Sequence, residues 1–158
     1  MRKSSYVCAA LAAAALLSGG VAKAQDKAVA DNVVAAARAL AETEKSKGLG
    51  VAFSEMRGCY EKELPYSHIF TLPLQQCVTK DMIVSRVVAE FSKTMSDEQR
   101  KSNDLPDAQA AIAAMQERVV GVFQRMRVAP EEAKRFTELV RNRGMDAYGR
   151  ARYPERFK

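Results

Sequence analysis

The sequence predicts an all-α protein: a small bundle of five or six helices, stabilised by one disulfide and preceded by a cleaved signal peptide. Apolar residues recur at steps of three and four over most of the chain, which is the period of one face of a helix. No alternation of apolar and polar residues is long enough to predict a strand. The 134 residues after the predicted leader are close to the commonest domain size, so we expect one helical domain over residues 25–158.

Residues 1–24 have the three parts of a secretory signal peptide. A basic start (Arg2, Lys3) precedes an apolar run over residues 7–17, and an A-x-A cleavage site ends at Ala24. The apolar run is shorter than the roughly 20 residues that a membrane-spanning helix needs. We therefore expect cleavage after Ala24, export to the periplasm or secretion, and no membrane span in the mature chain.

Cleavage would leave two cysteines, Cys59 and Cys77, because Cys8 lies in the leader. An even pair in an exported chain predicts a disulfide, since oxidising compartments form and keep such bonds. The spacing matches neither the C-x-x-C of redox and zinc sites nor the C-x-x-C-H of haem attachment.

The first two helices have clear apolar faces and clear ends. Val29, Val33, Ala36 and Leu40 share one face of the first helix, which we expect Gly48 and Gly50 to end. A second helix carries Phe53, Met56, Tyr60 and Leu64, and Pro65 ends it. Residues 65–76 contain two prolines and no helical period, so we expect a loop between the cysteines.

The later helices are marked by capping residues. We expect Thr79 to begin a third helix, and Ser96–Gln99 matches the S-x-x-Q capping box of a short one. Asp104 and Pro106 precede a long apolar stripe that ends near Met126. Pro130 suits the first turn of a last helix, which we expect to stop at Gly144.

Charge is unevenly distributed along the chain. Removal of the leader lowers the formal charge from +6 to +3, because the leader holds three basic residues and no acidic one. From Arg118 onward there are 11 basic and 5 acidic residues. Residues 145–158 form a basic-aromatic C-terminal tail, and interfaces are enriched in arginine and aromatic side chains. The residues that we expect to bind a partner there are Tyr148, Arg150, Arg152, Tyr153 and Arg156.

The only histidine, His68, lies in the predicted loop between the cysteines and is a further candidate for partner binding. A catalytic histidine needs a nucleophile or an orienting carboxylate within reach, and no known pattern of that kind surrounds it. The sequence also lacks the zinc, calcium, phosphate-loop and nucleophile-elbow motifs. We therefore expect no catalytic residue, metal or cofactor.

Ser96–Gln99 and the later Ala129–Glu132 resemble the repeated L-T-x-x-Q elements of Spy-type periplasmic chaperones, although neither has the Leu-Thr start. Small exported immunity proteins resemble this chain in organisation, with a signal peptide, a disulfide and an all-α fold. The sequence thus predicts a non-enzymatic protein that binds a protein or an anionic component of the cell envelope, in a chaperone-like or an inhibitor-like manner. Nucleic acid is not expected in that compartment. The alternative is a small envelope enzyme with a carboxylate or His68 site inside the bundle.

Overall fold

The structure, a computed structural model, describes residues 10–102 and 106–158, with side chains from residue 24 onward. Within this part of the chain there are helices and no strand, which confirms the predicted fold class. The α-helices are α1 (Ala10–Lys47), α2 (Leu49–Glu63), α3 (Leu72–Ser92), α4 (Asp97–Ser102), α5 (Ala108–Arg125), α6 (Pro130–Leu139) and α7 (Met145–Arg152). A π-helical turn, η1 (Val140–Gly144), joins α6 to α7, and a 3-10 turn, η2 (Pro154–Phe157), follows α7.

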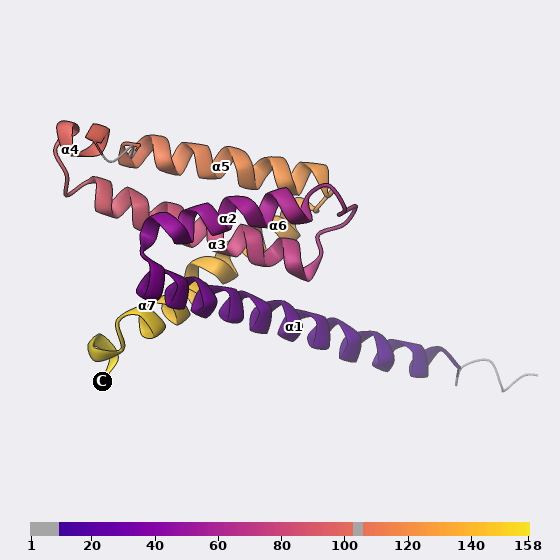
Figure 1. Cartoon of the computed structure of the whole chain (residues 1–158). Helices are drawn as coiled ribbons and strands as arrows, with labels where there is room; N and C mark the ends of the chain where they lie inside the picture. The colour runs from indigo at the N-terminus through magenta and orange to yellow at the C-terminus, as the bar shows by residue number, and fades with distance from the viewer. Residues whose placement is uncertain (1–9, 103–105) are drawn as a thin grey trace, which may run out of the picture.

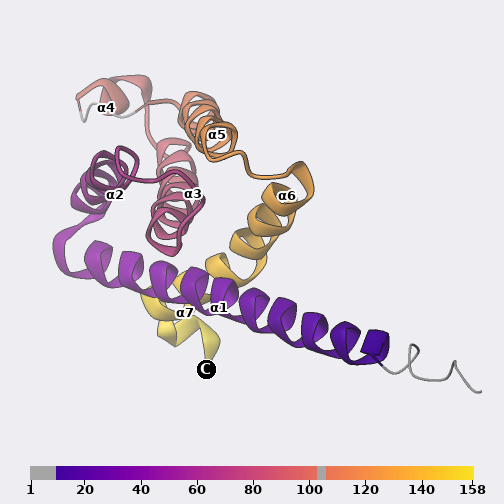
Figure 2. The same ribbon diagram turned by 90° about the vertical axis from the view of Figure 1, so that its right-hand side faces the viewer.

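Helix α3 lies in the middle of the bundle, where it packs against α1, α2 and α5 (Figure 2). The continuous helical segment α6–η1–α7 crosses α1 and packs on it through η1 and α7. The N-terminal part of α1 projects beyond the other helices (Figure 1). Ala24 to Ala28 are exposed, and Ala30 is the first buried residue of α1 among the described side chains. The leader predicted for residues 1–24 falls partly on residues 1–9, which lie outside the described residues.

A turn at Gly48 separates α1 from α2, as the sequence predicts. Its φ of 90° lies in the left-handed region, which glycine adopts without a steric penalty. Gly50, by contrast, continues into the first turn of α2. The N-terminal glycine of the pair therefore breaks the helix.

The Cys59–Cys77 disulfide joins α2 to α3 across a Cα–Cα distance of 5.5 Å, which confirms the predicted crosslink. The predicted loop after Pro65 is shorter than expected, because α3 begins at Leu72 and not near Thr79. Thr71 is the cap: its side chain accepts a hydrogen bond from the backbone nitrogen of Leu74, 3.3 Å away. Thr79 is fully buried within α3.

Two other helices, α4 and α5, begin directly after a capping residue. The predicted capping box is confirmed: Ser96 Oγ accepts from the Gln99 nitrogen at 3.3 Å, and Gln99 Oε1 accepts from the Ser96 nitrogen at 2.8 Å. Helix α5 is capped by Asp107, which accepts from two backbone nitrogens. Asp104, which we expected to open this helix, lies outside the described residues.

Gly144 does not stop the last helix, contrary to the prediction. It is buried in η1 and the chain continues directly into α7. A Cβ built on Gly144 would lie 3.2 Å from Val33 Cγ1 of α1 and 3.5 Å from Ile83 Cδ1 of α3. The glycine is needed for close helix packing, a role that a single sequence does not distinguish from a helix stop.

Candidate functional site

Two of the predicted C-terminal binding residues connect α7 to α1. Tyr148 is only 4% exposed, and its hydroxyl donates a hydrogen bond to Glu44 Oε2. Arg152 Nε lies 3.2 Å from the other oxygen of Glu44, within ion-pair range but without the alignment of a hydrogen bond. Burial and the Glu44 bond raise the pKa of Tyr148 well above its usual value. Tyr148 and Arg152 thus have structural partners inside the fold.

The other predicted C-terminal residues have partners within the C-terminal region. Arg150 Nε hydrogen bonds both oxygens of Asp146, at 3.0 and 2.9 Å, and its guanidinium lies 4.9 Å from the ring centre of Phe157. Arg152 and Arg156 each lie 4.9 Å from the ring centre of Tyr153. Arg150 and Arg156 remain exposed. The predicted tail is therefore ordered as α7 and η2, with arginine guanidinium groups over the rings of Tyr153 and Phe157.

The His68 loop is fixed at its base and exposed at its tip. The disulfide joins the flanking helices, and Arg125 Nη2 donates to the Leu64 carbonyl at 3.1 Å. Phe70 forms edge-on contacts with Phe123 and Phe136, with ring centres 5.4 and 5.0 Å apart. His68 itself is exposed, beside Tyr66 and Ile69, which are 84% and 68% exposed.

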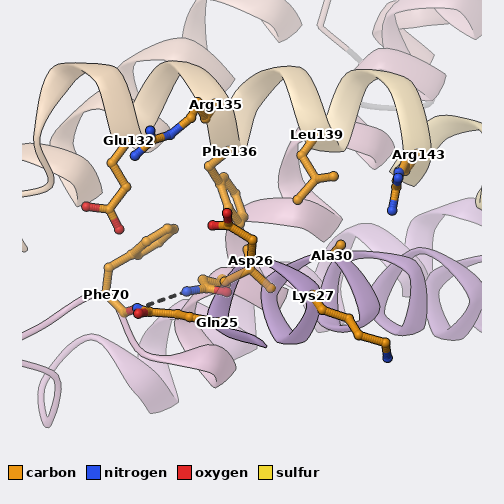
Figure 3. A pocket seen from close by; sticks show the side chains of 12 residues that line it. Gln25, Asp26, Lys27, Ala30, Phe70, Glu132, Arg135, Phe136, Leu139 and Arg143 are labelled. Atoms are coloured by element: carbon orange, nitrogen blue, oxygen red, sulfur yellow. Dashed lines mark hydrogen bonds between the residues drawn. The ribbon is translucent and has the colours of Figure 1, made fainter. Parts of the chain in front are cut away.

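A hollow of about 780 Å³ lies between the N-terminal part of α1 and α6 (Figure 3). Phe136 and Leu139 point from α6 towards α1, and Phe70 enters from the α2–α3 loop, so the floor is apolar. Charged side chains of both signs also line it, and the carboxylate of Asp26 points from α1 towards Phe136. We name it the α1–α6 hollow; its charged lining residues are Asp26, Lys27, Glu132, Arg135 and Arg143.

A second hollow, of about 580 Å³, lies between α1 and α7, and Arg143 lines both. Three arginines line this α1–α7 hollow: Arg38, Arg143 and Arg150. Its one lining carboxylate, Asp146, is already hydrogen bonded to Arg150. We refer to the two hollows together as the arginine groove.

Three guanidinium groups of the arginine groove lack a carboxylate partner. Among the described residues no ion pair involves Arg38, Arg135 or Arg143. An uncompensated guanidinium attracts an anion and presents donors in a fork that matches a carboxylate. The α1–α7 hollow, whose one carboxylate is paired with Arg150, can therefore hold an acidic group.

Sequence reasoning missed the arginine groove because it is made by helix crossing. Helical spacing places Arg135, Leu139 and Arg143 along one side of α6 and η1, which signals a mixed charged and apolar face. Only the fold shows that α1 crosses that face and adds Arg38 to it. The π turn also adds a residue to the helical turn between Leu139 and α7, as π turns often do at functional sites.

Comparisons with known protein families, with curated proteins and with solved structures find no match. In the described part of the chain, no helix has both the length and the apolar character to cross a membrane. No group of three or more histidine, cysteine or acidic side chains that could hold a metal ion occurs in the same residues.

Proposed function

We propose that this chain is an exported, non-enzymatic protein that binds an acidic segment of a partner protein in the cell envelope. The observation that carries the proposal is the arginine groove, in which three arginines without a carboxylate partner among the described residues line two hollows that share Arg143. Electrostatic complementarity steers encounter and selects partners with the opposite charge. The apolar floor between α1 and α6 would contribute affinity.

Two features of the structure support export. The Cys59–Cys77 disulfide is of the kind that persists in oxidising compartments. Cleavage after Ala24 would leave the core intact, because the first buried residue among the described side chains of α1 is Ala30. Gln25, the new N-terminus, lines the α1–α6 hollow, so its ammonium would add a positive charge there.

The groove fits one specific partner, as in inhibitor-like or immunity-like binding, better than it fits many unfolded clients. Promiscuous binding surfaces are often flexible and rich in methionine. Here Met56, Met82 and Met115 are at most 5% exposed and belong to the core. The groove walls are held together by close packing at Gly144, which favours one partner of matching shape.

The placement of His68 supports binding over the enzymatic alternative. An active site would need His68 and carboxylates to converge in a pocket. His68 is exposed on its loop and lines neither hollow of the arginine groove. The fully buried carboxylate of Asp81 already forms an ion pair, with Arg118.

The proposal is tested by partner capture with matched charge variants. Mature protein (residues 25–158) would be immobilised and exposed to envelope extract from the cells that make it. We expect the wild type to retain one partner, and the Arg38→Gln/Arg143→Gln double variant to lose it. Arg141→Gln is the matched control, because Arg141 is exposed on the same π turn but lines neither hollow. Failure to retain any partner, or equal retention by the double variant, would overturn the proposal.

A second assay separates the two modes of binding. An inhibitor-like protein should leave the aggregation of unrelated unfolded proteins unchanged while binding its one partner. A chaperone-like protein should suppress that aggregation for several clients. Unchanged aggregation supports a groove that binds one partner, and suppressed aggregation of several clients contradicts it.

A further inference from the structure

A polar network is buried between α2, α3 and α5, away from the arginine groove. Asp81 is fully buried and accepts four hydrogen bonds. Arg118 approaches it in a bidentate manner, with Nη2 2.7 Å from Oδ1 and Nε 3.0 Å from Oδ2. The Ser85 and Tyr60 hydroxyls donate at 2.9 and 3.2 Å. The carboxylate is therefore fully satisfied, and it fixes the position of the Arg118 side chain.

The outer edge of Arg118 is not used by this network. Its side chain is 35% exposed, and only Nε and Nη2 take part in hydrogen bonds with Asp81 and Ser85. Among the described residues, Nη1 has no hydrogen-bond acceptor. One nitrogen of a rigidly positioned guanidinium is thus free to donate outward.

Arg118 forms part of the wall of a small surface pocket between α2 and α5, with a volume of about 320 Å³. We name it the α2–α5 pocket; its lining residues are Tyr60, Leu64, Arg118, Gly121, Val122 and Arg125. Its volume is at the lower end of the roughly 300–1,000 Å³ typical of ligand sites. Two arginines on an otherwise apolar lining match the usual composition of such sites, in which few polar groups orient an apolar ligand.

The charge in this pocket is not balanced. Asp81 neutralises Arg118, whereas Arg125 has a backbone carbonyl, that of Leu64, as its partner and forms no ion pair among the described residues. The α2–α5 pocket therefore has an excess of one positive charge. A ligand with one negative charge would balance it, and a more highly charged anion would leave an excess negative charge beside apolar walls.

Gly121 keeps the pocket open. A glycine inside a helix lowers the stability of the helix, and such a position often reflects close packing. At Gly121 a Cβ would meet no atom within 4 Å, so packing does not require the glycine. Absence of a side chain there leaves free space beside Tyr60 and Val122, in the position where an apolar ligand body would lie.

We propose that the α2–α5 pocket binds a small amphiphilic monocarboxylate, with its carboxylate on Arg125 and the free Nη1 of Arg118 and its apolar body on Leu64, Val122 and Gly121. Asp81 acts as a positioning residue, because it orients Arg118 without lining the pocket. This inference does not depend on the arginine groove, and each can fail without the other.

The test uses the mature protein and three probes with the same eight-carbon chain: octanoate, octanol and octylammonium, each below its aggregation concentration. Amide chemical shifts would be followed by NMR. We expect octanoate to produce saturable shifts around Leu64 and along residues 118–125, with octanol at least about ten-fold weaker and octylammonium without a site. Equal binding of octanoate and octanol, or absence of a saturable shift with octanoate, would overturn the proposal.

Two variants locate the site. Arg125→Gln should weaken octanoate binding about ten-fold and leave octanol binding unchanged, whereas Arg125→Lys should retain a preference for the anion. Gly121→Leu should abolish binding by filling the pocket. Gly58→Leu is its matched control, because Gly58 is also helical with open space at its Cβ and lies outside the α2–α5 pocket. Circular dichroism would confirm that each variant is folded, and equal loss of binding in both glycine variants would contradict the assignment.

Discussion

Glu44 of α1 and Tyr148 of α7 lie 104 residues apart in sequence and share a hydrogen bond beneath Arg152. The bond fixes the C-terminal helix on the N-terminal one, and these two helices form one wall each of the α1–α7 hollow. Tyr148 therefore helps to hold α7 in the position in which it forms this wall of the hollow.

Tyr148→Phe should lower the free energy of unfolding by about 1–3 kcal/mol, the usual cost of removing a buried hydrogen bond to a charged group. Tyr153→Phe makes the same chemical change five residues away, on a tyrosine whose hydroxyl has no hydrogen-bond partner among the described residues, and should change stability little. Urea unfolding of both variants is the measurement. Equal midpoints for the two variants would contradict the role of the Glu44 bond.

Alkaline pH should destabilise the fold through two tyrosines. Burial raises the pKa of Tyr60 and of Tyr148, and the neighbouring carboxylates Asp81 and Glu44 raise them further. A raised pKa in the folded state means that the neutral phenol stabilises the fold below the ordinary tyrosine pKa of about 10. This stabilisation is lost as the pH rises above that value, because only the unfolded chain then ionises readily.

The measurement is the free energy of unfolding as a function of pH. The wild type should lose stability above about pH 10, and the Tyr60→Phe and Tyr148→Phe variants should each lose less over the same range. A wild-type stability that is constant across this range would contradict the burial of the two hydroxyls.

The disulfide should account for about 3 kcal/mol of stability, because a loop of this length costs that much entropy to close in the chain-entropy model. The Cys59→Ala/Cys77→Ala variant tests this by urea unfolding, and alanine avoids placing a hydroxyl at the fully buried Cys77. Mass spectrometry of the wild type should show a gain of two hydrogens on reduction. An unchanged mass would mean that the thiols are free.

Gly144→Ala should destabilise the fold by about 1–3 kcal/mol, the range for overpacking, because the added methyl would lie 3.2 Å from Val33 Cγ1. Gly121→Ala and Gly58→Ala have open space at the same atom and should stabilise their helices, each by up to about 1 kcal/mol. Val33 is fully buried, so Val33→Ala should destabilise the fold on its own, but the double variant with Gly144→Ala should lose less stability than the sum of the two single losses. Equal stability of all three glycine variants would contradict a packing role for Gly144.

The sequence predicted the features that depend on neighbours along the chain. The Ser96–Gln99 capping box and Pro130 at the start of α6 are local signals, and both are confirmed. The disulfide followed from cysteine parity and the predicted compartment. Thr79 was misassigned as a cap because Thr71 and Pro73 offered an equally good helix start nearer the N-terminus.

The features that the sequence did not reveal depend on where the helices cross one another. Gly144 has the same local signature as a helix stop, and only its distance to Val33 shows otherwise. Of the arginines predicted from composition, Arg150 lines the α1–α7 hollow and Arg152 pairs with Glu44 of α1. Arg38 and Arg143, which the prediction did not include, lie 105 positions apart in sequence and line the same hollow. No spacing rule relates two residues on helices whose crossing point is unknown.

Partner binding at the arginine groove is tested by the affinity of the captured envelope partner for Arg143→Gln and for Arg141→Gln. The groove predicts that Arg143→Gln weakens binding about ten-fold or more at low salt, with a smaller difference at high salt, and that Arg141→Gln is close to the wild type. Equal affinities for the two variants would show that the partner does not bind at the arginine groove.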